Sequence, residues 1–539
     1  MERKHKLKAN SPRAKHRHPA ILAGFGFLLC IGIATSATIG TAQEPLPLYE
    51  PIQPGDADEI SVEGAWKNIR SDGLVVALRE LTLAPKSEPR PALSVRLLPD
   101  DYESVPGNAA FFYMQAMAWA EQSNARRMRD EFERKYVEQA QQENMSISEV
   151  PPHVWRESTR PEDLPLDQVK EYLSYSAFQK RFLEQAWRRP HCDFDRRIRE
   201  VESPAMVLLP EIQAMRGLAR TQSLRFLTAI AEDRTDDAVT IFGQQLAFAP
   251  HLSQETFLVS NLVGLACASI GISDASYLCE HPDAPNMYWA IAALPNPLVN
   301  TRPSLAFERQ FLFEEFKQLK EIDTTPKSNE FLRESLAALK KAVEHLSSGP
   351  VEPFSGMGEL STSLAVASGV PGAKRYLTEV EGIDVETIDS LPRTQVFLLG
   401  VRRYYENARD ELFKWQYLTY AQVQRHRKDP RQRLENDLQE YGLIAAPSGA
   451  VLSAVNAVMI AQTRQKQSLA LLQTIESIRH HLAANDNKLP ASLDELELPA
   501  LDDPATGKPF TYLRHSEGAS LYGAPWPGYR VQYELRTAP

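Results

Sequence analysis

Residues 205–281 constrain the fold more than any other part of the sequence, because their apolar residues recur with the spacing of a helix. Arg216 and Arg220 fall on another face of the same helix. The apolar positions of the first face are Leu208, Ile212, Met215, Ala219, Phe226 and Ile230. A polar turn over 232–237 leads to a second helix over 238–249, which Pro250 closes. A third helix, over 258–278, is apolar on nearly all sides, so we expect it at the centre of the fold.

Two helices joined by a short polar turn and followed by a third resemble the helix-pair unit of tetratricopeptide-type arrays. The chain has no strict period and no repeated consensus, so we expect an irregular array. Glycine is scarce (25 of 539 residues) and proline is frequent (38), which suits helices that end sharply. The predicted fold class is mainly α: an irregular helical array with tetratricopeptide-like helix pairs, a long C-terminal helix and a small antiparallel β tail.

The N-terminus has the order of an export signal. Residues 1–18 carry seven basic residues and one acid, residues 19–42 carry no charge, and small residues precede Gln43. This order is typical of a secretory signal, with Gly40 and Ala42 at the −3 and −1 positions of a cleavage site. The competing interpretation is a retained anchor, because an uncharged stretch of this length is sufficient to span a bilayer. Both interpretations export the remainder across the cytoplasmic membrane, to the periplasm or to an anchored position there.

Charge limits the class of partner. Residues 1–42 hold seven basic residues and one acid, so without them the net charge of −10 becomes about −16. Nucleic-acid binding needs clustered positive charge, and we therefore expect no nucleic-acid partner. We expect a protein partner at the cell envelope and contact with the membrane only through the N-terminal segment.

Composition divides the chain into four segments. Residues 1–42 are the signal peptide or anchor, and 43–107 form a Pro-rich tether, of which 66–83 are amphipathic and suited to folding back onto the body. Residues 108–445 form the helical-array body, beginning with Asn108 as an N-cap. Residues 446–539 form a long helix, expected to project from the body, and a tail of alternating segments typical of short strands.

Three stretches of the body and tail have two interpretations each. The basic cluster over 425–433 suits either a phosphate or membrane patch or the C-terminus of a helix, whose dipole attracts cations. The aromatic residues over 404–420 suit either a groove or a core. The uncharged stretch 443–461 suits either a second membrane span or, as we favour, a buried helix.

Candidate chemistry is sparse. The densest reactive cluster is His191, Cys192, Asp193 and Asp195. It suits a Cys/His nucleophile completed by distant residues, a metal site or, as we favour, a turn in which Pro190 ends one segment and the aspartates cap the next. His480 and His481, with Asp486, are a weaker metal candidate, because adjacent helix positions point about 100° apart. Residues 355–358 fall short of a nucleophile elbow. We therefore assign no catalytic, cofactor-binding or metal residue, and no cofactor.

Three cysteines remain outside the N-terminal segment: Cys192, Cys267 and Cys279. An odd number cannot all pair within one chain. Cys267 and Cys279 lie in apolar helical sequence, where buried thiols are the expected state, and a disulfide between them is the alternative.

Two resemblances to known families add to these patterns. Residues 489–496 (LPASLDEL) and 502–512 (DDPATGKPFTY) resemble the C-terminal part of type II secretion major pseudopilins, which implies a long helix followed by a small antiparallel sheet. The exported chain resembles a group of large uncharacterised exported proteins of planctomycete-type bacteria, through 106–110, 191–195, 284–290 and 294–295. This second resemblance implies export and a helical body, and no activity.

The function that these patterns favour is binding or scaffolding at the cell envelope through a helical surface, as in solenoid proteins. Two alternatives stay open. One is an envelope hydrolase with its site between helices, which a pocket with convergent polar groups would favour. The other is a secretion-apparatus component, which would require a tail sheet that stands free of the body.

Overall fold

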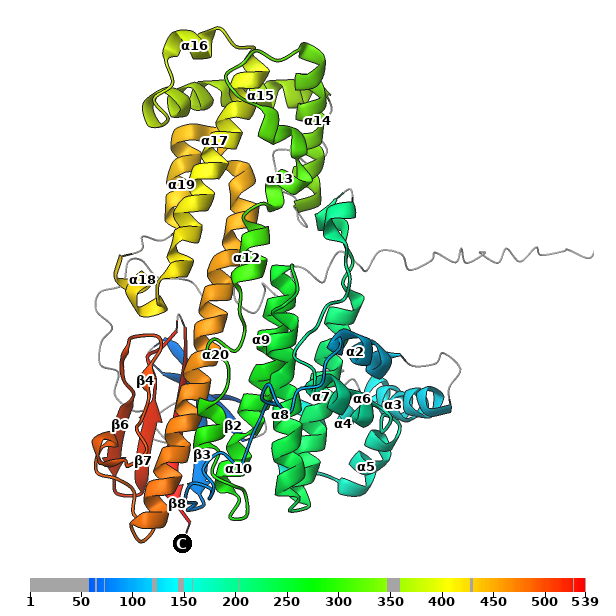
Figure 1. The fold of residues 1–539 in the computed structure, drawn as a ribbon, viewed down its shortest axis with the longest axis vertical. Coiled ribbons are helices and arrows are strands. Elements are labelled where there is room, and N and C mark those ends of the chain that lie inside the picture. Colours follow the sequence, from blue (N-terminus) through cyan, green and yellow to red (C-terminus); the bar gives the residue numbers. More distant parts are fainter. Residues whose placement is uncertain are drawn as a thin grey trace, which may run out of the picture.

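A computed structural model describes residues 58–538, apart from 64, 72, 119–123, 144–149, 158, 202, 347–358, 427–429 and 527. The fold is mainly α, with a six-stranded sheet against the lower part of the helical body (Figure 1). The predicted signal or anchor over 1–42 lies outside the described residues, as do residues 355–358.

In the lower body, helices distant in the sequence pack together (Figure 1). Its first helices are α2 (Ala109–Met117), α3 (Asn124–Gln142), α4 (Pro151–Glu157), α5 (Leu166–Ser174) and α6 (Gln179–Trp187). The central ones are α7 (Pro210–Ala231), α8 (Thr235–Leu252) and α9 (Leu258–Asp274), followed by the short α10 (Ser276–Glu280) and α11 (Tyr288–Ala292). Helix α2 contacts α6 and α7, and α7 contacts α9. The predicted triplet of helices is confirmed, with α7, α8 and α9 packed against one another.

Two details of that triplet differ from the sequence prediction. Leu208 precedes α7 and is 69% exposed, because Pro210 occupies the first turn and the helix begins there. Helix α8 continues through Pro250 to Leu252, so this proline does not close it. Asn108 is an N-cap as expected, its side chain accepting a hydrogen bond from the Ala110 amide at 3.0 Å.

A second group of helices, here called the upper lobe, has its own apolar core. The short α12 (Arg302–Glu308) leads into it. The lobe comprises α13 (Phe311–Glu315), α14 (Asn329–Leu346), α15 (Glu359–Arg375), α16 (Val385–Asp389), α17 (Arg393–Phe413) and α19 (Pro430–Tyr441). The short α18 (Tyr420–His426) lies outside it, and its Tyr420 contacts Trp526 of the tail with ring centroids 5.2 Å apart. Tyr404, Tyr405 and Phe413 are buried, so the core interpretation is confirmed for these three aromatic residues. It is wrong for Tyr417, which is 70% exposed, and Trp415 and Tyr420 are half-buried. Within the basic cluster, Arg433 pairs with Glu411 at 3.3 Å, and Arg427 and Lys428 lie outside the described residues.

The long helix α20 (Ala446–Ala484) joins the upper lobe to the sheet, and it does not project from the body as we expected (Figure 1). Leu471, Leu472 and Ile475 are fully buried in the same core as α7 and α8. The physical reason is that α20 offers apolar residues to the body and to the sheet at once, so both sides are covered.

The sheet contains strands from both ends of the described chain, in the order β1-β2-β3-β8-β7-β6. The tail strands are β6 (Thr511–His515), β7 (Gly518–Tyr522) and β8 (Tyr529–Thr537), paired antiparallel. The others are β1 (Asp58–Glu63), β2 (Trp66–Ser71) and β3 (Leu74–Leu83). β3 pairs parallel with β8 from Val75↔Tyr529 to Leu83↔Thr537. A separate two-stranded ladder joins β4 (Asp502–Asp503) to β5 (Lys508–Pro509).

The tether expected over 43–107 is therefore wrong for residues 58–83. The amphipathic piece folds back as predicted, but as strands, because apolar residues such as Leu81 and Leu83 alternate toward the core. Trp66 contacts Tyr533 of β8 with ring centroids 5.4 Å apart and donates a hydrogen bond to Ser273 Oγ at 2.8 Å. This end of the chain is thus a structural part of the tail sheet.

One segment of the described chain, Leu258–Glu280, is long and apolar enough to cross a membrane. Most of its apolar window is buried inside the protein, against α7, α8 and α20. A buried central helix explains this composition, in agreement with the sequence prediction for 258–278.

Candidate functional site

The described residues form a pocket of about 460 Å³ on the lower body, within the roughly 300–1,000 Å³ typical of ligand sites. Segments distant in the sequence build its walls: the loop 93–104, residues 187–190 at the end of α6, the C-terminal end of α8, and residues 289–295. Leu97, Ala247 and Ala290 are buried and form its floor. Leu93, which is 60% exposed, and the exposed Pro190, Ala293 and Pro295 form its rim.

His251 at the pocket wall has both ring nitrogens engaged. Nε2 lies 2.6 Å from the Arg189 carbonyl oxygen, and Nδ1 lies 2.7 Å from the Tyr113 hydroxyl. A carbonyl can only accept, so Nε2 carries the proton and Nδ1 accepts from Tyr113. Burial lowers the pKa of His251 to about 4, because a charged ring would be desolvated there. The imidazole is therefore neutral at neutral pH and has no nitrogen free to act as a base.

Two tryptophans are held in the walls by their ring N–H groups. Trp187 Nε1 donates to the Leu97 carbonyl oxygen at 2.9 Å, and Trp289 Nε1 donates to Glu88 Oε2 at 2.6 Å. These bonds fix the ring orientations, and the indole N–H is the only polar group of the ring. Both rings consequently offer only apolar surface to the pocket.

The charged groups of the pocket are paired within the protein. Arg96 contacts Asp100 and lies 3.0 Å from Glu103, and the hydrogen bond to Glu103 raises the pKa of Arg96. Arg189 donates to the Gln185 carbonyl and lies over the Phe112 ring, 4.0 Å from its centroid. The pocket therefore offers apolar walls, with Arg96 paired to carboxylates and Arg189 bonded to a carbonyl oxygen and a ring.

The cluster that the sequence singled out lies directly after the pocket residue Pro190. Cys192 is buried in a core with Tyr113 and Cys267, and burial raises the pKa of its thiol well above the usual range. His191, Asp193 and Asp195 are exposed. Because the thiol lies in the core and the His191 side chain at the surface, the structure does not join them as nucleophile and base.

The same segment connects α2 to the α8–α9 junction. The Asp193 amide donates to Asn108 Oδ1 at 2.9 Å, and Asn108 Nδ2 donates to the Asp193 carbonyl at 2.6 Å. The Cys192 amide donates to Gln254 Oε1 at 3.0 Å. The backbone of 191–195 thus has a structural role. The predicted capping by its aspartates is wrong, because the next helical segment, Ile198–Glu200, has Arg197 as its N-cap and no side-chain cap, while Asp193 Oδ1 accepts from the Asp195 amide at 2.8 Å.

Behind this segment lies an ion triad that no sequence pattern indicated. Arg196 contacts Glu211 and Glu255, and all three side chains are largely buried. The two glutamates are 44 positions apart in the sequence, so no local pattern could have revealed that they share one arginine.

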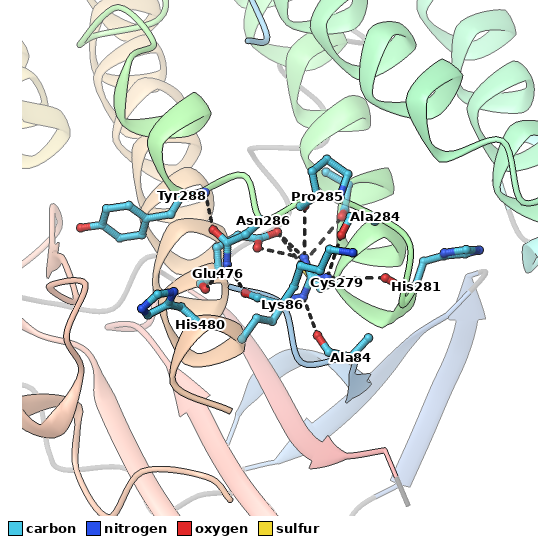
Figure 2. A network of polar contacts seen from close by, with 12 residues as sticks. Ala84, Lys86, Cys279, His281, Ala284, Pro285, Asn286, Tyr288, Glu476 and His480 are labelled. Carbon is cyan, nitrogen blue, oxygen red and sulfur yellow. Dashed lines mark hydrogen bonds and ion pairs between the residues drawn. The ribbon is translucent and has the colours of Figure 1, made fainter. Parts of the chain in front are cut away.

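A buried polar network centred on Arg479 joins three segments of the chain (Figure 2). Arg479 and Glu476 form an ion pair at 2.9 Å with both side chains 0% exposed. Arg479 also donates to the carbonyl oxygens of Ala84 at 2.9 Å and Ala284 at 3.3 Å. The Cys279 thiol donates to Glu476 at 3.5 Å. The network therefore ties the chain leaving β3 and the α10–α11 connection to α20.

This network also orients a wall of the pocket. The Lys86 amide donates to the Arg479 carbonyl at 3.0 Å, and the Glu88 amide donates to His480 Nδ1 at 3.0 Å. Glu88 in turn accepts the bond from Trp289. His480 is thus a structural partner of Glu88, whereas the other members of the metal candidate lie elsewhere: His481 is half-buried and Asp486 is exposed beyond the end of α20.

Cys267 and Cys279 are free and buried, and they belong to different core clusters. The predicted buried thiols are confirmed, and the alternative disulfide is wrong. Across the described ranges, no group of three or more His, Cys, Asp or Glu side chains is arranged to hold a metal ion.

The pocket was not predicted from the sequence. In the sequence, the only indication of this pocket was the presence of Trp187 and Trp289, two of the seven tryptophans. Both line the same pocket only because of how α6 and α11 pack. Comparisons with protein-family models, curated protein sequences and solved structures find no match to this chain. The functional conclusion therefore rests on the geometry itself.

Proposed function

We propose that this chain is an exported binding or scaffolding protein of the cell envelope, which binds a protein partner through the surface of its helical body. The observation that carries the proposal is the preformed pocket, whose polar side chains are all engaged within the protein. Such a pocket suits recognition of an apolar group, since none of its described side chains is a free acid, base or nucleophile that could act on a substrate.

Export rests on the sequence of residues 1–42, with its basic, apolar and small-residue order. The acidic charge of the remainder, about −16, supports a partner other than nucleic acid. Membrane contact is proposed only through the N-terminal segment.

The hydrolase alternative is disfavoured by the residues nearest the pocket. His251 has no free ring nitrogen, and the Cys192 thiol is buried with a raised pKa. Neither group is therefore exposed to a ligand of this pocket and poised for proton transfer.

The secretion-apparatus alternative is disfavoured by the packing of the tail. β8 is covered on one side by β7 and on the other by β3, and Leu521 and Leu535 share a core with α7 and α8. A tail held in this way differs from the free-standing sheet that assembly would require.

The test is a crosslinking pull-down from native envelopes, with an affinity tag inserted after Glu44. We expect one partner protein at near-equal amount with the wild-type chain. The matched control lacks residues 2–42 and stays in the cytoplasm, where it should not recover that partner. Recovery of the chain alone from the envelope would contradict the proposal.

A further inference from the structure

We propose, resting on the binding function above, that the pocket is the anchor site for one large apolar side chain of the partner protein, preferably an aromatic one. The partner's backbone would remain outside, across the rim formed by Leu93, Pro190 and Pro295. Three observations support this occupant: the polarity of the pocket, the residue types that line it, and the net charge of the chain.

The polarity of the pocket favours an apolar group. Trp187, Trp289 and His251 all direct their polar atoms to groups of the protein, at 2.6–2.9 Å. A polar ligand entering the pocket would lose its bonds to water and gain few replacements. An apolar side chain loses nothing, and its own polar backbone stays in solvent at the rim.

The composition of the pocket and its surroundings favours a protein partner. Trp, Tyr and Arg dominate the residues that contribute most to protein–protein binding. Trp187, Trp289, Arg96 and Arg189 line this pocket, and Tyr102, on the same loop, is 97% exposed beside it. The exposed Tyr102 and Leu93 extend the contact surface beyond the pocket, as expected for a macromolecular partner rather than a small enclosed ligand.

The charge of the chain disfavours a lipid occupant. An acyl chain would fill the same apolar volume, but it is presented by a membrane whose surface is usually anionic. The exported chain carries about −16, and its repulsion from such a surface opposes lipid delivery.

The pocket is also preorganised. Its tryptophans are fixed by hydrogen bonds, and Trp289 is tied through Glu88 to His480 of α20. A binding site that is already ordered avoids the entropic cost of ordering on association.

The test uses two neighbouring alanines as a matched pair. Ala293 lines the pocket and Ala292 does not, and both side chains are exposed. Ala293→Trp should fill the pocket, and Ala292→Trp should leave it open. The probe is N-acetyl-tryptophanamide, titrated against the full chain in lipid nanodiscs with nuclear magnetic resonance detection. Equal melting temperatures of the two variants would establish that both fold.

We expect the probe to bind the wild type and Ala292→Trp equally, and to bind Ala293→Trp at least about 30-fold more weakly, the loss typical of a removed interface anchor. Equal binding to both variants would overturn the proposal. Tighter binding of decanoate than of N-acetyl-tryptophanamide, abolished by Ala293→Trp, would also overturn it in favour of an acyl site.

The envelope pull-down separates this inference from the function on which it rests. If wild type and both variants recover the same partner equally, the pocket inference fails and the binding function stands. If Ala292→Trp recovers the partner and Ala293→Trp does not, both are supported. If no chain recovers a partner, the proposed function fails, whatever the probe shows.

Discussion

Replacing Glu476 by glutamine removes the charge that neutralises Arg479 in the network of Figure 2 while keeping the shape of the side chain. Arg479 would then be a buried cation bonded only to carbonyl oxygens, such as those of Ala84 and Ala284. Breaking a buried ion pair in this way typically costs about 3–5 kcal/mol. At about 1.4 kcal/mol per tenfold change, the local opening constant should rise roughly 100- to 4,000-fold.

Native-state hydrogen exchange with mass spectrometry measures this change where it occurs. The Ala84 amide is bonded to the Cys279 carbonyl and the Lys86 amide to the Arg479 carbonyl, both at 3.0 Å, so both amides report opening of the network. Their exchange should accelerate in Glu476→Gln, while amides of α17 in the upper lobe keep their rates. The surface variant Lys374→Gln, which breaks an exposed pair with Asp389, is the matched control and should leave exchange at 84–86 unchanged.

A double-mutant cycle sharpens the test. Arg479→Met and Glu476→Gln should together cost clearly less than the sum of their single effects, since each leaves the other group unpaired. An acceleration below about fivefold in Glu476→Gln, or additive effects in the cycle, would refute the claim that this pair holds the three segments together.

Three further predictions concern pH and packing. Burial raises the pKa of Asp274 to about 7, so the folded chain keeps a proton that the unfolded chain releases near pH 4. The free energy of unfolding should therefore fall as pH rises between these two values. In thermal melts, Asp274→Asn should remove up to about 4 kcal/mol of that fall. Burial lowers the pKa of His251 to about 4, so stability should instead be lost as pH falls from 6.5 to 4, and His251→Gln should flatten the profile there. A Cβ at Gly243 would lie 2.2 Å from the Leu97 carbonyl oxygen. Gly243→Ala should therefore displace the pocket loop and lower the melting temperature by several degrees. Gly217 has open space around it, so Gly217→Ala should leave the melting temperature unchanged or raise it.

Each of these predictions has an outcome that contradicts it. An unchanged pH profile in Asp274→Asn would mean that this carboxyl is ionised in the folded chain. A profile in His251→Gln that still falls below pH 6.5 as in the wild type would place the acid sensitivity elsewhere. Equal melting temperatures for Gly243→Ala and Gly217→Ala would show that the loop carrying Leu97 yields without cost.

The helices could be predicted from the sequence, because local spacing encodes a helix. The apolar period over 205–281 predicted α7, α8 and α9, and the nearly uncharged 258–278 predicted a central position for α9. Local composition also indicated buried thiols at Cys267 and Cys279. Each of these conclusions depends on residues within a few turns of one another.

The meeting of distant segments is a property of the packed chain alone. β3 pairs with β8 across more than 450 positions, and the local sequence of either strand does not indicate which strand it pairs with. For this reason we expected a tether over 43–107 where the structure has three strands. The same holds for Glu211 and Glu255 around Arg196, and for the pocket between Leu97, Trp187, His251 and Trp289. Periodicity indicates which face of a helix or strand is buried, but it does not indicate which other element covers that face. Many apolar faces could pack against one another, and only the packing of the whole chain selects the pairs that form.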